Sequence, residues 1–222
     1  MPASVHHCLL LRFLPVLFMC LSAPSDALPL TVESVAEIPI LAAISSNDQG
    51  VFEVLLLRWD RLPHPSPIVL KWKGGNIHPG QSNLSSMTRA FEYAIDHTSH
   101  LEHTGTVTAM GVAYASTGSD GPSAGAVMTV GFAALFKGDR IRRGIALTGT
   151  ITTDGTIGPV GGIPDKIRAA VREGYRIILI PEGQRYDPEW NIDRLAMDLN
   201  VEVKEVSRIE EAYHLMTGGS LE

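Results

Sequence analysis

Apolar and polar residues alternate along the chain in a way that predicts strands first, and then a regular succession of helices and strands. Apolar, β-favouring runs predict strands over Val51–Trp59, Ile68–Trp72 and Thr106–Ala115, and the spacing of apolar residues predicts a helix over Ser85–His97. Further along, the predicted elements are helix Pro122–Phe136, strand Gly144–Leu147, helix Pro164–Arg172, strand Arg176–Ile180, helix Asp187–Leu199, strand Val201–Val206 and helix Ser207–Met216. This pattern predicts one domain over residues 28–222 with an α/β (α+β) fold, in which helices cover a sheet.

The N-terminal segment differs from the rest of the chain. Phe13–Leu21 is an almost unbroken apolar run, shorter than the ~20 residues that span a bilayer. Ser25-Asp26-Ala27 then supplies the small residues of a cleavage site. We therefore predict that residues 1–27 are a signal peptide and that the protein is secreted or periplasmic. An uncleaved membrane anchor over residues 8–23 is the alternative, because the residues before the run contain one arginine and no lysine.

Composition and charge exclude several partners. The formal net charge of -6 makes nucleic acid an unexpected partner. Both cysteines, Cys8 and Cys20, lie in the leader, so the cleaved protein would have neither a disulfide nor a thiolate metal site. His97, His100 and His103 are spaced three apart but share one helical face only loosely. We predict no metal and no cofactor.

The stretch SDGPSAG, residues 119–125, is the first candidate for chemistry. Proline is favoured at the first helical position, so Pro122 is expected to place Gly121 at the N-cap and Ser123 in the first turn. Free N–H groups and the positive end of the helix dipole stabilise the negative oxygen of a tetrahedral acyl intermediate. The same turn would then hold a nucleophile and its oxyanion donors. The alternative is that Ser123 has no catalytic role and only occupies the first turn of a tightly packed helix.

A nucleophilic serine needs a base, and two candidates exist. In GGIPDKIRAAVREGY, Lys166 lies at the edge of an apolar stripe formed by Ile163, Ile167, Ala170 and Val171. Burial there would lower its pKa and leave a neutral amine able to accept a proton. The alternative is a lysine with a buried stem and a solvated head.

Histidine is the second candidate base. Gly121–Gly125 also satisfies the G-x-S-x-G pattern of α/β-hydrolases, for which His214 is the one histidine downstream of Ser123. An esterase with these two residues ranks below the lysine hypothesis, because the polar residues 116–120 replace the strand that the elbow requires.

Together these segments resemble the proteolytic domain of the Lon protease family. The matching residues are Asp120–Gly125, Thr148-Gly149, Gly158–Ile163 leading to Lys166, and Ile178–Glu182. Ser123 and Lys166 lie 43 positions apart, the separation expected for that family. The resemblance covers roughly residues 106–216, and it implies an α/β fold shared with certain ribosomal proteins and small-molecule kinases.

The resemblance implies a Ser-Lys catalytic dyad. Ser123 would be the nucleophile and Lys166 the general base, with Thr148 bonded to the lysine amine and with Asp120 and Gly121 supporting the serine turn. The implied activity is ATP-independent hydrolysis of peptide bonds in peptides or unfolded proteins. Family members assemble as rings, so a homo-oligomer is expected.

Three features depart from the family pattern. Thr150 stands where a glutamate usually follows Thr-Gly, and the histidine and glutamate often found upstream of Asp120 in bacterial members are missing. The ATPase module and any P-loop motif are also absent from these residues. A binding or scaffold module without protease activity is therefore a competing interpretation, which the intact Ser123, Thr148 and Lys166 disfavour.

Overall fold

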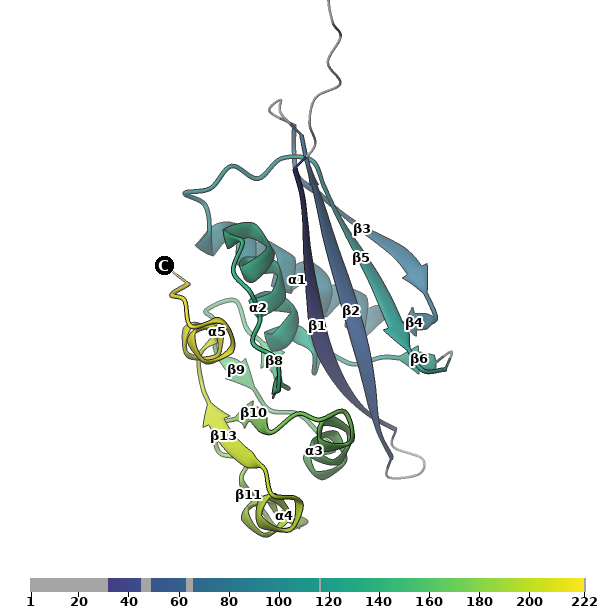
Figure 1. Ribbon diagram of the computed structural model, residues 1–222, viewed down its shortest axis with the longest axis vertical. Helices are drawn as coiled ribbons and strands as arrows, with labels where there is room; N and C mark the ends of the chain where they lie inside the picture. The colour runs from purple at the N-terminus through teal and green to yellow at the C-terminus, as the bar shows by residue number, and fades with distance from the viewer. Residues whose placement is uncertain (1–31, 45–48, 63–65, 116, 222) are drawn as a thin grey trace, which may run out of the picture.

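The computed structural model describes residues 32–44, 49–62, 66–115 and 117–221 (Figure 1). The predicted signal peptide, residues 1–27, lies outside the described part of the chain. Within that part, no helix combines the length and the apolar character that crossing a bilayer requires.

The larger sheet has four strands in the order β1-β2-β5-β3. Its strands are β1 (Val32–Ile44), β2 (Gln49–Arg61), β3 (Val69–Gly75) and β5 (Thr106–Ala113). β2 pairs antiparallel with both β1 and β5, whereas β3 and β5 are parallel. β1 is thus an edge strand. Proline has no N–H to donate to a neighbouring strand, so Pro39 is tolerated at this edge but would cost a hydrogen bond in a central strand. The sequence patterns did not predict β1, because this proline interrupts its apolar run.

The smaller sheet is fully parallel, in the order β13-β10-β7. Its strands are β7 (Ile145–Leu147), β10 (Ile177–Pro181) and β13 (Glu202–Val206). Three short ladders complete the strands: β4 (Ile77–Pro79) with β6 (Thr117–Ser119), β8 (Thr150–Ile151) with β9 (Ile157–Gly158), and β11 (Tyr186–Asp187) with β12 (Trp190–Asn191).

Five helices pack on these sheets in the described chain. They are α1 (Gln81–His97), α2 (Gly125–Lys137), α3 (Ile163–Arg172), α4 (Ile192–Leu199) and α5 (Ile209–Thr217). Figure 1 shows α1 and α2 together on one side of the long strands, while α3, α4 and α5 surround the smaller sheet. The mixed architecture confirms the predicted α/β fold.

Helix α2 forms the centre of the main hydrophobic core. Every residue from Gly125 to Phe136 is buried, as expected for a helix that is apolar on all sides. It contacts α1, α5 and strands of both sheets. Phe132 and Phe136 pack edge-to-face against Phe91 of α1, which fixes the two helices side by side. These contacts hold α2, and with it the N-cap residue Ala124, against α1.

The structure corrects the predicted start of α4. This helix begins at Ile192 rather than at Asp187, because the residues between form the β11–β12 hairpin. The N–H of Glu189 donates to Asp187 Oδ1 at 2.9 Å and closes the hairpin turn. Asn191 then caps the helix, as its Oδ1 accepts from the N–H of Arg194 at 2.9 Å.

Gly50 sets the distance between β2 and α3. A methyl group built at this position would overlap the backbone carbonyl of Asp165 and lie 2.9 Å from Cβ of Ala169. The carbonyl of Gly50 also accepts from Arg172 Nη2 at 2.6 Å. We expect Gly50→Ala to lower the free energy of unfolding in urea by about 1–3 kcal/mol, because overpacking forces α3 away from the sheet.

Gly118→Ala is the matched control, since a methyl group at Gly118 meets open space. Equal unfolding free energies for the two variants would contradict the close approach at Gly50.

Candidate active site

A cavity of about 710 Å³ lies beside the N-terminal ends of α2 and α3. Ser123 and Lys166, which are distant in sequence, both line it. Five segments supply the rest of its wall: β1, the first turn of α1, the turn before α2, the start of α3 and the β11–β12 hairpin. Their residues are Ile40–Ala43, Asn83, Ser119–Ala124, Gly161, Gly162, Pro164, Asp165, Glu189 and Trp190. The structure therefore brings together the two residues that the sequence singled out for chemistry.

Ser123 lies in the turn that leads into α2, one step before the N-cap. The helix begins at Gly125 with Ala124 as N-cap, so the prediction that Pro122 opens the helix with Gly121 as N-cap is wrong. The carbonyl of Pro122 accepts from the N–H of Gly125 at 3.0 Å, in a tight turn. The carbonyl of Ser123 instead accepts from the N–H of Gly149 at 2.9 Å. Because these carbonyls are bonded outside a helical ladder, regular i to i+4 bonding starts only at Ala124.

The half-buried Ser123 keeps the backbone donor that the sequence predicted. Its N–H donates no hydrogen bond to another described residue. The first helical hydrogen bond runs from the N–H of Met128 to the carbonyl of Ala124, so the amides before it remain outside the helical ladder. The serine thus lies where N–H groups can meet a negatively charged oxygen.

Lys166 is buried on the inner face of α3. Gly162, at φ 65°, is the N-cap, and Pro164 lies in the first turn, where its missing N–H costs nothing. Ile163, Ile167 and Ala170 are fully buried, and Lys166 itself is 3% exposed, which confirms the predicted stripe. Burial lowers the pKa of Lys166 from its ordinary 10.5 to about 8. A substantial fraction of this amine is therefore neutral in mildly alkaline solution.

Thr148 connects the lysine to the serine turn. Lys166 Nζ donates to Thr148 Oγ1 at 3.2 Å. The same hydroxyl donates to the carbonyl of Ser123 at 3.3 Å, and its side chain is 1% exposed. One threonine thus gives the buried amine an acceptor and fixes the amine relative to the backbone of Ser123. Thr150, the departure from the family pattern, lies two residues on in β8, where it pairs with Gly158.

Asp120 and Gly121 shape the turn before the serine. Asp120 Oδ1 accepts from the backbone N–H of Asn83 at 3.1 Å, which ties the turn to the start of α1. Backbone donors on Gly121 and Asn83 lower the pKa of Asp120. Gly121 has φ 112°, a conformation that side chains disfavour. Both residues line the cavity, and their contacts stabilise the turn that precedes Ser123.

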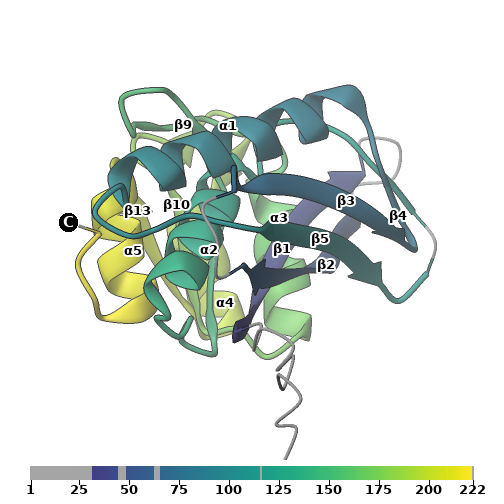
Figure 2. The same cartoon turned by 90° about the horizontal axis from the view of Figure 1, so that it is seen from above.

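The histidines singled out by the sequence lie elsewhere. His214 is exposed on α5, and its Nδ1 lies 3.1 Å from the carbonyl of Gly219. α5 and the β4–β6 ladder, which leads into the serine turn, lie at opposite ends of the domain (Figure 2). The structure therefore does not place His214 among the described residues that line the cavity. His97 and His103 bond separately, to Tyr93 and Thr98.

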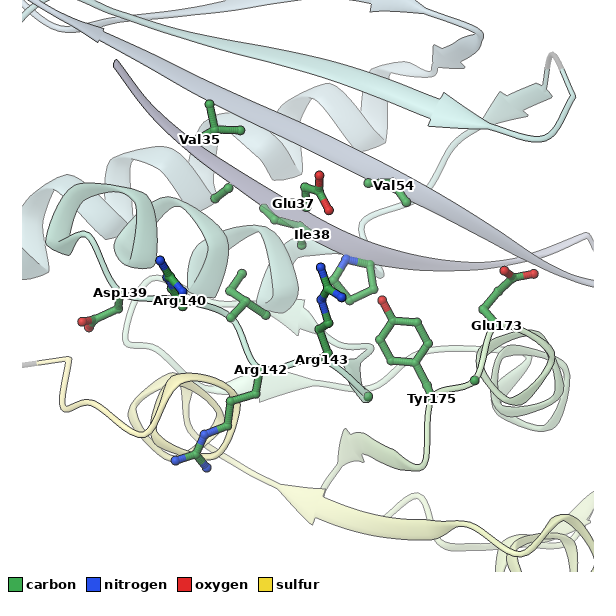
Figure 3. A pocket seen from close by; sticks show the side chains of 15 residues that line it. Val35, Glu37, Ile38, Val54, Asp139, Arg140, Arg142, Arg143, Glu173 and Tyr175 are labelled. Atoms are coloured by element: carbon green, nitrogen blue, oxygen red, sulfur yellow. The ribbon is translucent and has the colours of Figure 1, made fainter. Parts of the chain in front are cut away.

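A second cavity of about 700 Å³ is lined by an earlier stretch of β1, Val35–Pro39, and by the connection from α2 to β7 (Figure 3). Arg143 and Tyr175 point toward β1 in this view, and Arg142 points away toward α5. No serine, threonine, cysteine, histidine or lysine is among its described lining residues. The chemistry of the side chains, and not the volume, therefore distinguishes the Ser123 cavity.

Sequence reasoning missed part of the cavity wall. Ala42 and Ala43 come from an edge strand that was not predicted, and Glu189 and Trp190 come from a hairpin that was predicted to be helical. Asn83 reaches the cavity through its contact with Asp120. No local pattern marks these positions, because only tertiary contacts bring them to the site.

Comparison with known families gives the class of protein. The family model for the Lon protease (S16) C-terminal proteolytic domain matches residues 80–216, more than half of the chain. The chain therefore belongs to this family of serine proteases. The match begins one residue before α1 and ends within α5. It therefore includes every described residue that lines the Ser123 cavity except those of β1.

Curated Lon proteases are similar over shorter stretches. "Lon protease 2" of Syntrophobacter fumaroxidans is 44% identical over 86 residues, which is 39% of this chain and 11% of the relative. "Lon protease" of Escherichia coli K12 is 38% identical over 100 residues, 45% of this chain and 12% of the relative. "Lon protease homolog 2, peroxisomal" of Rattus norvegicus is 43% identical over 81 residues, 36% of this chain and 10% of the relative. The matched segments span about a tenth of the length of these relatives.

Proposed function

We propose that the chain is an ATP-independent serine endopeptidase in which Ser123 is the nucleophile and Lys166 the general base. The observation that carries this proposal is the buried amine of Lys166, held by Thr148 in the same cavity as Ser123. A lysine can act as a base at moderate pH only when its environment disfavours the charged form, and burial does so here. Family membership supports the serine chemistry in general.

The proposed reaction has two halves. Neutral Lys166 takes the proton from Ser123 Oγ as this oxygen attacks the carbonyl carbon of the scissile bond. Backbone N–H groups of Ser123 and of the preceding turn stabilise the oxyanion, and the ammonium of Lys166 then gives its proton to the leaving amine. Water attacks the acyl-serine in the second half, with Lys166 again taking a proton and returning it to Oγ. Each proton that leaves Ser123 is thus accounted for.

Thr148 has a positioning role in this scheme. Because its hydroxyl accepts from Lys166 and donates to the backbone of Ser123, it directs the amine toward the serine turn in either protonation state. The substrates proposed are peptides and unfolded proteins. The 222 residues contain no P-loop motif, so these residues themselves supply no phosphate-binding loop for ATP.

The test uses the purified full chain with a quenched fluorescent peptide and a chemically unfolded protein, with and without Mg-ATP. We expect cleavage of both substrates at a rate that Mg-ATP leaves unchanged, and covalent labelling of Ser123 by a serine-reactive probe. Stimulation by Mg-ATP of more than a few-fold would contradict ATP independence. A chain that neither cleaves nor becomes labelled would instead be a binding module.

A further inference from the structure

Glu53 is a buried carboxyl group that the proposed chemistry does not use. It lies on β2, in the inward-facing row that continues with Leu55, Leu57 and Trp59, and its side chain is 3% exposed. Carboxyl groups are rarely found in a core without a partner. Burial raises the pKa of Glu53, which favours the protonated acid.

The carboxyl group of Glu53 lies beside the residue that precedes the serine turn. Its neighbour is the side chain of Ser119, which lowers the pKa of Glu53 against the effect of burial, is 7% exposed and ends β6. The carbonyl of Ser119 accepts from the N–H of Gly80 at 2.9 Å, and the next residue, Asp120, bonds Asn83. Both sides of Ser119 are thus anchored immediately before the turn that carries Ser123.

Glu53 also lines a small cavity at the start of α2. This cavity of about 20 Å³ is lined as well by Asn83, Ala124 and Met128. Ala124 follows Ser123 directly and is the N-cap of α2. No other charged residue is among the described residues that line this cavity. Glu53 therefore lies next to both ends of the turn that carries Ser123. It contacts Ser119 before the turn, and it lines the small cavity together with Ala124 after the turn.

We propose that Glu53 is a positioning residue that holds Ser119 and thereby fixes the Asp120–Ser123 turn in the geometry needed for attack. The inference rests on the proposed function, because it assigns Glu53 to the support of the proposed nucleophile. Glu53 acts through Ser119 and does not touch the substrate. Its effect should therefore appear in the chemical step and in the order of the turn, and not in substrate affinity.

The test compares Glu53→Leu, Ser119→Ala, their double variant and Glu53→Gln. We expect each of the first two to lower kcat by about 10- to 100-fold with little change in KM, since a small misplacement of a reacting group costs up to ~10²-fold. The double variant should be no slower than the slower single variant, because both changes break one interaction. Glu53→Gln keeps the size and an acceptor oxygen for Ser119, and should retain a rate near that of the wild type.

The matched control is Thr98→Val, which removes the bonds of a buried hydroxyl group away from the cavity. Thr98 Oγ1 donates to the carbonyl of Ala94 at 2.6 Å and lies 2.9 Å from His103 Nε2. It should lower Tm without changing kcat. Amide hydrogen exchange over residues 120–124 should quicken in Glu53→Leu and stay unchanged in Thr98→Val.

The positioning role is overturned if exchange over 120–124 is the same in Glu53→Leu and wild type. It is also overturned if the two single effects add in the double variant, or if Glu53→Gln is as slow as Glu53→Leu. Because exchange does not depend on activity, an inactive wild type would overturn the proposed function alone.

Discussion

Ser123→Ala will abolish peptide hydrolysis, with kcat at least about 10³-fold below the wild type and no labelling by a serine-reactive probe. The reason is that the proposed reaction needs the oxygen nucleophile Ser123 Oγ at the end of the turn, which alanine lacks. The half-buried side chain makes no hydrogen bond to another described residue that the fold would lose. Tm should therefore change by no more than a few degrees. The measurement is steady-state cleavage of a quenched fluorescent peptide.

Ser99→Ala is the matched control for this experiment, because Ser99 is exposed in the turn that follows α1. It should cleave the peptide at the wild-type rate. If Ser123→Ala also cleaved at that rate, a different nucleophile would carry the activity and the assignment of Ser123 would be wrong.

Lys166→Met will also abolish hydrolysis, and it will make the fold more stable below pH 8. The folded pKa of about 8 lies below the ordinary 10.5, so below pH 8 the native state holds a charged amine in a buried site. This penalty amounts to roughly 3 kcal/mol and decreases as the pH rises from 8 to 10.5, where the unfolded chain also loses its proton. Methionine fills nearly the same volume without a charge. Urea unfolding at pH 6 and pH 10 measures the difference.

The activity of the wild type should follow the same titration. Because the proposed base, Lys166, must be neutral to accept a proton, kcat/KM should rise with pH and reach half of its maximum near pH 8. Lys73→Met, on the exposed face of β3, is the control and should keep both the rate and the pH profile. A pH profile that is flat from pH 6 to pH 9, or an active Lys166→Met enzyme, would exclude Lys166 as the base.

Much of the architecture follows from local patterns that the sequence shows directly. The 3.6-residue spacing of Ile163, Ile167 and Ala170 determines which face of α3 is buried, and therefore that Lys166 faces the core. The apolar run of α2 likewise predicts a central helix. These predictions succeed because helical and strand periodicity depend only on neighbours in the chain.

The residues around the site are harder to predict from local sequence patterns. The edge strand β1 contains Pro39, and Glu53 interrupts an apolar row in β2, so local rules favour neither a strand nor a core position there. The β11–β12 hairpin contains apolar residues at spacings that also suit a helix. In each case a contact with a distant segment decides between two locally acceptable structures.

The sequence by itself determined the fold class, the buried face of α3 and the motifs that place the chain among Lon-type proteolytic domains. Only the tertiary structure decided that α2 begins after Ser123, that Thr148 connects Lys166 to the serine turn, and that Glu53 lies behind that turn. The physical reason is that the hydrogen bond between Gly149 and Ser123, and the contact between Glu53 and Ser119, join residues that lie far apart in the chain. Their free energy exists only once both partners have been brought together and removed from water.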